Sequence, residues 1–196
     1  MKTIHAKSFG LFLLAFSLST AVFAQTKKVD VSKSMVNWEG KKVTGAHNGT
    51  MGIKEGTLKY TNGKVMGGKV VVDMQSLTVL DLTNPESNGK LVGHLKSDDF
   101  FSVATNPTSE LVVTKVESNG NSHTFTGNLT IKGITNVVTF PATSSKEGSN
   151  SIYKGRLTID RSKYNVRFGS KSFFNDIGDK AIDDNFTLDF SLVVPA

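Results

Sequence analysis

Apolar and polar side chains alternate along most of the chain from residue 29 onward. In residues 185–194, for example, every second position is apolar, and polar residues such as Asn185 and Asp189 lie between them. A period of two is typical of antiparallel strands that have one buried face and one solvated face. The pattern therefore predicts an all-β protein of about eight strands: 34–43, 50–60, 64–74, 109–117, 123–131, 136–144, 152–160 and 185–194.

Short turn sequences separate these predicted strands. Asn62-Gly63 and Asn119-Gly120 are typical of tight hairpins, because Asn and Gly both tolerate a positive φ. Lys132-Gly133 and residues 146–148 mark two further reversals. A sheet of eight strands can close on itself and lose its edges, leaving an interior just wide enough for side chains or one small ligand. We expect an eight-stranded antiparallel barrel, with a two-sheet sandwich as the alternative.

Two stretches interrupt the alternation. Asn84-Pro85 pairs a capping residue with a proline at the first helical position, and apolar residues then follow at helical spacing. This predicts a short amphipathic helix at about 84–96, near one mouth of the barrel. Residues 161–182 form a long connection that carries Phe168, Phe173 and Phe174. Long connections with aromatic residues are often lids or binding loops, so we expect this loop and residues 84–101 to form a mouth that opens.

The N-terminus has the parts of a secretory signal peptide. Lys2 and Lys7 are basic, residues 9–18 form a short apolar run, and small residues lead to Ala24. The apolar run is shorter than the roughly 20 residues that a membrane-spanning helix needs. We therefore expect residues 1–24 to be a signal peptide and residues 25–196 to form one periplasmic or secreted domain, without an integral membrane segment. A buried N-terminal helix is the alternative.

Composition narrows the chemistry that the chain can perform. Its 196 residues include no Cys and four His, which excludes disulfides, thiolate metal sites and a Cys nucleophile. We expect no metal site and no cofactor. Without Lys2 and Lys7, 21 basic side chains face 17 acidic ones. This mild excess is spread along the chain, whereas nucleic-acid binders concentrate it on one face, so we expect no nucleic-acid partner.

Short blocks spread over residues 29–194 carry a resemblance to one family. They are Asp30, Ser34-Met35-Val36-Asn37-Trp38, His47-Asn48-Gly49, Gly52, Asp73-Met74-Gln75-Ser76, His94-Leu95-Lys96-Ser97-Asp98-Asp99-Phe100-Phe101, Pro107, the hairpin Gly127–Thr135, Phe140-Pro141 and Arg167-Phe168-Gly169. In these blocks the chain resembles the YceI family of exported, lipocalin-like β-barrels that bind polyisoprenoids and other long-chain lipids. The last block departs from the familiar Arg-x-x-Phe-Gly form. The resemblance implies a bound lipid, such as an isoprenoid, as ligand.

The predicted inward faces contain four glycines, Gly40, Gly52, Gly127 and Gly155, which leave volume unfilled. A dry core is the alternative from the residues alone, and the family resemblance favours a cavity for a slender hydrocarbon chain. Burial of such a chain is worth about 0.8 kcal/mol per CH₂. We expect the cavity to be lined by Val36, Trp38, Met51, Ile53, Val72, Leu91, Leu95, Phe100, Phe101, Phe125, Leu129, Phe140, Leu157, Phe168, Phe173, Phe174, Phe186 and Phe190.

Basic residues gather on the long loop, where Arg161, Arg167 and Lys171 follow one another without an acidic residue between them. With His94, they are candidate contacts for a phosphate or carboxylate headgroup at the barrel mouth. The alternative is a solvated basic rim. His94 with Asp98 or Asp99 is also a candidate acid–base pair, although the spacing of the two Asp residues is typical of capping.

These observations lead to three hypotheses for function. The first is non-catalytic binding, storage or transport of a long-chain isoprenoid or similar amphiphilic lipid. The second is a lipid-acting hydrolase that uses His94 with Asp98 or Asp99. The third is an envelope interaction module with a filled core. A homodimer is a further partner that the sequence leaves open.

Overall fold

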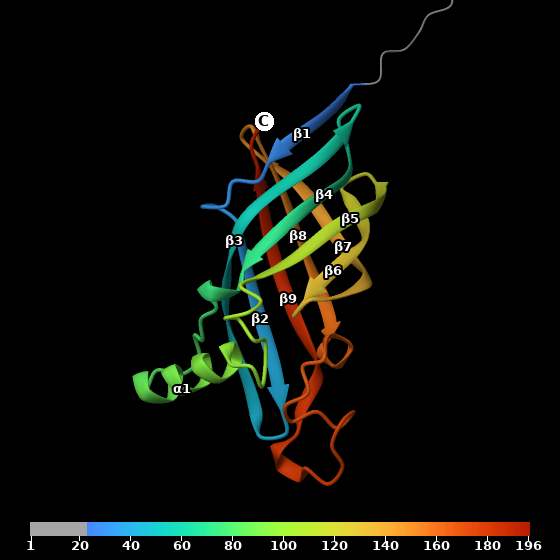
Figure 1. Ribbon diagram of the computed structural model, residues 1–196. Helices are drawn as coiled ribbons and strands as arrows, with labels where there is room; N and C mark the ends of the chain where they lie inside the picture. Colours follow the sequence, from blue (N-terminus) through green and yellow to red (C-terminus); the bar gives the residue numbers. More distant parts are fainter. Residues whose placement is uncertain (1–22) are drawn as a thin grey trace, which may run out of the picture.

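The computed structural model describes residues 23–196, so nearly all of the predicted signal peptide lies outside the described residues. Eight strands form a closed barrel in the order β3-β2-β9-β8-β7-β6-β5-β4, and β4 pairs back with β3 (Figure 1). The strand bounds are β1 Ala24–Lys28, β2 Met35–Lys42, β3 Gly45–Thr61, β4 Lys64–Asp73, β5 Thr108–Asn119, β6 Ser122–Ile131, β7 Ile134–Glu147, β8 Asn150–Asp160 and β9 Ile182–Val194. The predicted eight-stranded antiparallel barrel is confirmed, and the sandwich alternative is wrong.

The ninth strand, β1, was not predicted. β3 has 17 residues, of which Gly45–Met51 pair with β2 and Thr57–Thr61 pair with β1. The sequence of β1, Ala-Gln-Thr-Lys-Lys, has no alternating apolar positions, and most of it is exposed. Hydrophobic periodicity therefore gives no signal for it. The predicted cleavage after Ala24 would leave four of its five residues, and this cleavage stays a prediction.

The hairpins follow the expected turn chemistry. Asn62 and Gly63 have φ values of 48° and 77°, and Lys132 and Gly133 have values of 50° and 75°. These two hairpins are confirmed as two-residue turns in which both residues have positive φ. The hairpin at Asn119-Gly120 also forms, but one residue later than expected. Asn119 still pairs with Ser122, so the loop is Gly120-Asn121.

The predicted helix is confirmed as α1, Pro85–Lys96. The Asn84 side chain accepts a hydrogen bond from the backbone N–H of Ser87 at 2.9 Å, and Pro85 occupies the first turn. Three short 3-10 turns, Met74–Ser76, Arg161–Tyr164 and Gly178–Lys180, complete the helical structure of the described residues. Figure 1 shows α1, the β2–β3 turn and the loop before β9 at one end of the barrel, with β1 and the C-terminus at the other. Within residues 23–196, no helix combines the length and apolar character needed to cross a membrane.

A short strap, residues 77–80, covers the edge that β3 exposes where β4 ends. The strap donates from Thr78 N to Thr50 O at 3.0 Å and from Leu80 N to Asn48 O at 2.9 Å. From β2, the Trp38 indole N–H donates to Thr78 O at 3.0 Å. To reach it, the indole passes over Gly49, its partner residue on β3. A Cβ at Gly49 would lie 1.8 Å from Thr78 O, so this crossing requires glycine.

This close approach gives a test of the fold. We expect Gly49→Ala to lower the free energy of unfolding by about 2 kcal/mol, because the added methyl must displace the strap backbone and the indole. Urea denaturation measures the change. Gly89→Ala is the matched control, because nothing lies within 4 Å of its Cβ position on α1. The control should be stabilising by up to about 1 kcal/mol. Equal stability of Gly49→Ala and the parent chain would show that the strap does not pack as described.

Candidate functional site

The barrel interior contains a cavity of about 270 Å³, and all eight barrel strands and α1 contribute to its wall. Most of the wall is apolar. Several side chains of the wall are only half-buried although they face the interior: they pack against the core on one side and border the cavity on the other. These side chains are Val72, Leu111, Phe186, Leu188 and Phe190. The protein therefore does not fill its own interior.

Most of the residues expected to line the cavity lie in its wall. The structure brings together Val36, Trp38, Met51, Val72, Leu91, Leu95, Phe100, Phe101, Phe125, Leu129, Phe140, Leu157, Phe168, Phe186 and Phe190. The expectation omitted other wall residues, among them Leu111 and Leu188. Leu188 lies between Phe186 and Phe190 in the same alternating segment, so the sequence pattern contained the signal needed to find it.

Three of the expected residues lie elsewhere. Ile53 is buried in the core but does not border the cavity. Phe173 and Phe174 are exposed on the loop, where the backbone N–H groups of both donate to Ser170 O. The guanidinium of Arg167 lies over the Phe173 ring, 4.9 Å from its centroid. Tight turns within the loop leave these two rings exposed and outside the cavity wall, which the spacing of aromatic residues does not reveal.

Three of the four glycines do not have the role expected of them. Gly52 faces outward, because its neighbours Met51 and Ile53 both face the interior. A Cβ at Gly127 would lie 2.6 Å from Val112 O, and one at Gly155 would lie 2.5 Å from Pro141 O. Glycine at these two positions allows close approach of neighbouring backbone. Of the four, Gly40 alone borders the cavity, so the free volume comes from the width of the closed sheet.

The cavity opens at one end and is closed at the other. Its wall includes Lys41 and Lys42, which are exposed, and Phe168, whose side chain is 46% exposed. The open mouth is therefore at the end that carries α1 and the loop before β9 (Figure 1). At the other end, the buried hydroxyls of Tyr60 and Tyr153 lie 3.2 Å apart. Burial and this hydrogen bond raise the pKa of Tyr60, so it stays neutral.

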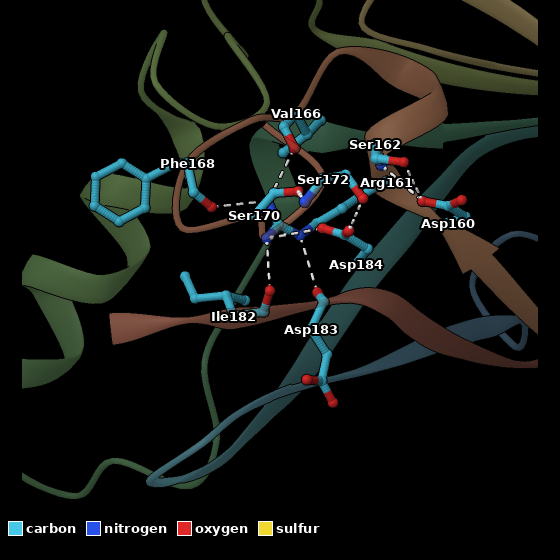
Figure 2. Close-up of polar contacts among 10 residues, drawn as sticks. All are labelled: Asp160, Arg161, Ser162, Val166, Phe168, Ser170, Ser172, Ile182, Asp183 and Asp184. Carbon is cyan, nitrogen blue, oxygen red and sulfur yellow. Dashed lines mark hydrogen bonds and ion pairs between the residues drawn. The ribbon is translucent and has the colours of Figure 1, made fainter. Parts of the chain in front are cut away.

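Arg161 lies at the mouth, but its guanidinium is bound to the protein. Its side chain is 2% exposed. Nε donates to Asp183 O at 3.0 Å, Nη1 to Val166 O and Phe168 O, both at 2.9 Å, and Nη2 to Ile182 O at 2.9 Å. Figure 2 shows these bonds joining Arg161 to the loop, at Val166 and Phe168, and to the start of β9, at Ile182 and Asp183. Arg161 was expected to contact a headgroup. In the structure its side chain joins the loop to β9.

Asp184 completes this network. One of its carboxylate oxygens lies 3.5 Å from Nη2 of Arg161, and the other accepts from the Ser172 hydroxyl at 2.6 Å (Figure 2). Burial raises the pKa of Asp184, but hydrogen bonds from Ser170 and Ser172 and the charge of Arg161 together lower it below its usual value. The carboxylate therefore stays ionised opposite the guanidinium.

The other expected headgroup contacts separate into two groups. Arg167 and Lys171 are exposed and do not border the cavity, in agreement with the solvated-rim alternative. His94 does border it, and its ring lies 4.3 Å from the Phe168 ring and 5.7 Å from the Phe100 ring, centroid to centroid.

The carboxylates of the candidate acid–base pair are used elsewhere or lie in solvent. Asp98 accepts from the Ser102 hydroxyl, and Asp99 is exposed. No hydrogen bond joins either carboxylate to His94 in the described part of the chain. Nor do residues 23–196 contain a group of three or more His, Asp or Glu side chains that could hold a metal ion.

The Arg161 network predicts a large effect of removing its charge. We expect Arg161→Met to lower the free energy of unfolding by about 3 kcal/mol, because four carbonyls, one buried and three partly buried, and Asp184 lose their partner. Limited proteolysis should then cleave the chain between residues 165 and 181. The control is Arg156→Met, which removes an exposed bidentate pair with Asp189 and should change stability much less. Equal effects of the two variants would contradict the account of the loop.

The lowered pKa of Asp184 predicts a pH dependence of stability. A carboxyl whose pKa is lower in the folded state stabilises the fold above its unfolded value, about 3.9, and loses this contribution as the pH falls through the folded value. Asp184→Asn should therefore be less stable than the parent chain at neutral pH, and the two should converge as the pH falls through the folded pKa of Asp184. Thermal unfolding measured across this range checks the prediction. A difference that does not change with pH would contradict it.

Comparisons with known proteins agree with this geometry. Residues 28–194 match the family model described as the YceI-like domain. A UPF0312 protein of Pseudomonas fluorescens is 29% identical over 153 residues, which are 76% of this chain and 76% of the relative. A UPF0312 protein of Pseudomonas aeruginosa is 44% identical over 57 residues, which are 29% of this chain. The latter match spans 30% of that relative's length.

Two solved structures share the fold. BcnA of Burkholderia cenocepacia has a TM-score of 0.65 and 27% identity, covering 84% of this chain and 98% of that one. A polyisoprenoid-binding domain from Saccharophagus degradans, implicated in plant cell wall breakdown, has a TM-score of 0.64 and 15% identity, covering 86% and 97%. Because the family model matches most of the described chain, the protein belongs to the YceI-like domain family.

Proposed function

We propose that this protein binds a long-chain lipid of the isoprenoid type, without chemical conversion, and stores or carries it in the periplasm or outside the cell. The observation that carries the proposal is the apolar cavity, bordered by inward-facing side chains that the protein itself leaves half-buried. Apolar surface that remains accessible inside a barrel gains free energy when a hydrocarbon covers it. Ten buried methylenes contribute about 8 kcal/mol before the costs of association.

The shape of the site favours a long amphiphile. A lipid tail can enter through the mouth and lie against the apolar wall as far as the closed end at Tyr60 and Tyr153. Its polar end would then remain near the mouth, where the side chains of Lys42 and His94 are found. The Saccharophagus neighbour, a polyisoprenoid-binding domain of the same fold, supports an isoprenoid as the class of tail. The predicted signal peptide supports action outside the cytoplasm.

The other two hypotheses have less support. A hydrolase would need His94 to act with Asp98 or Asp99, and neither carboxylate pairs with the imidazole in the described residues. An interaction module would need a filled core, whereas the interior holds a cavity. Both observations favour binding over the alternatives.

Organic extraction of the purified full chain, followed by mass spectrometry, tests the proposal. The expected result is one lipid per protein, released on extraction and rebound when the empty protein is mixed with a long-chain isoprenoid. Repeatedly empty extracts, together with no binding of added isoprenoids, would refute the proposal.

A variant that fills the cavity sharpens this test. Leu188 borders the cavity and is half-buried, so Leu188→Trp should occupy the space of the tail. We expect at least about ten-fold weaker binding, a loss of about 1.4 kcal/mol, measured by displacement of a fluorescent fatty probe. Leu80→Trp is the matched control, because Leu80 is 61% exposed outside the barrel and should bind like the parent chain. Unchanged binding by Leu188→Trp would place the ligand elsewhere.

A further inference from the structure

The buried polar atoms of the cavity wall have protein partners, with one exception. The Trp38 indole donates to Thr78 O at 3.0 Å, the Ser109 hydroxyl donates to Thr130 O at 2.8 Å, and the Tyr153 hydroxyl pairs with that of Tyr60. Nε2 of His94 is buried and has no hydrogen-bond partner among residues 23–196. A buried polar atom without a partner is costly, and its presence in a ligand cavity calls for an explanation.

The position of His94 explains how this atom is kept away from water. His94 lies on the same face of α1 as Leu91 and Leu95, and all three residues border the cavity. Its ring packs in a T-shaped arrangement with Phe168 and with Phe100, at interplanar angles of 68° and 66°. Rings on two sides restrict the orientation of the imidazole. Nε2 is covered in this structure, so a polar group on a bound lipid reaches it when a neighbouring ring, such as the exposed Phe168, moves aside.

The nearby cations do not provide a site for an anionic head. A guanidinium has five N–H groups, and those of Arg161 face four carbonyls and the Asp184 carboxylate. Lys41 lies 3.2 Å from Glu39, and its side chain is exposed, as is that of Lys42. Exposed lysines contribute little to the binding of an anion, because water and salt screen their charge. A phosphate at the mouth would thus lose hydration without gaining a buried cation.

We propose that Nε2 of His94 hydrogen-bonds the head of the bound lipid, and that the site selects a neutral oxygen head, a hydroxyl or carbonyl, over a phosphate. This inference rests on the proposed function and specifies the ligand class of the same cavity. An imidazole nitrogen can donate or accept a hydrogen bond, so it suits either a carbonyl or a hydroxyl. A single hydrogen bond satisfies both the imidazole and a neutral head, whereas a diphosphate needs several donors.

Three probes with the same tail test this selectivity: geranylgeraniol, geranylgeranyl diphosphate, and the matching isoprenoid hydrocarbon without oxygen. Their affinities for the full, delipidated chain are measured by competition against a fluorescent probe. We expect the alcohol to bind about ten-fold more tightly than the hydrocarbon and the diphosphate. Equal binding of alcohol and hydrocarbon, or preference for the diphosphate, would overturn the inference. Binding of none of the three would instead refute the proposed function.

Substitution at His94 separates a hydrogen bond from a packing role. His94→Leu should weaken binding of geranylgeraniol about ten-fold and leave hydrocarbon binding unchanged, whereas His94→Gln should keep part of the preference for the alcohol. Lys90→Leu is the control on the same helix, because Lys90 is 75% exposed and does not border the cavity. It should behave like the parent chain. If His94→Leu weakened both probes equally, the imidazole would serve packing alone and the inference would fail.

Discussion

The pairing of β4 with β3 closes the sheet, and this closure fixes the width of the interior. In a closed barrel of eight strands, the inward side chains just reach across or leave room for one small ligand. Here Phe186, Leu188 and Phe190 of β9 face the interior and stay half-buried. The hydrogen bonds between neighbouring strands fix the circumference of the barrel, so the strands cannot move inward to cover these three side chains. The cavity is therefore a consequence of backbone pairing, and glycine contributes to its wall only at Gly40.

The mouth depends on a second, polar interaction. A long loop has few apolar contacts of its own, and the backbone carbonyls that it buries need donors. Arg161 supplies four of these donors from one side chain and thereby joins residues 166 and 168 to residues 182 and 183. Its guanidinium also lies over the ring of Phe100, a residue just after α1 in the chain, 5.4 Å from the ring centroid. The loop and the helix are thus fixed around His94, the residue with an unpaired buried nitrogen.

Much of the fold and most of the cavity wall could be predicted from the sequence, for identifiable reasons. Period-two alternation reports which side chains face inward, so Phe125, Leu129 and Phe190 were placed at the cavity correctly. The same pattern is silent about β1, whose residues are polar, and about Phe173, whose direction depends on turns within a loop. Charge spacing was misleading for Arg161, because a sequence does not show which carbonyls a buried guanidinium will meet. The predictions that failed depend on contacts with distant parts of the chain or on turns within a loop. The predictions that rest on alternation along a strand were mostly correct.

The central claim is that hydrocarbon, and not protein, completes the interior of this barrel. A crystal structure of the chain purified without delipidation tests it most directly. The account predicts continuous, tube-shaped electron density between β9 and the opposite wall, ending within hydrogen-bond distance of His94 Nε2. It would be contradicted by a structure in which Val72, Leu111 and Leu188 meet across the centre and leave no space for a chain.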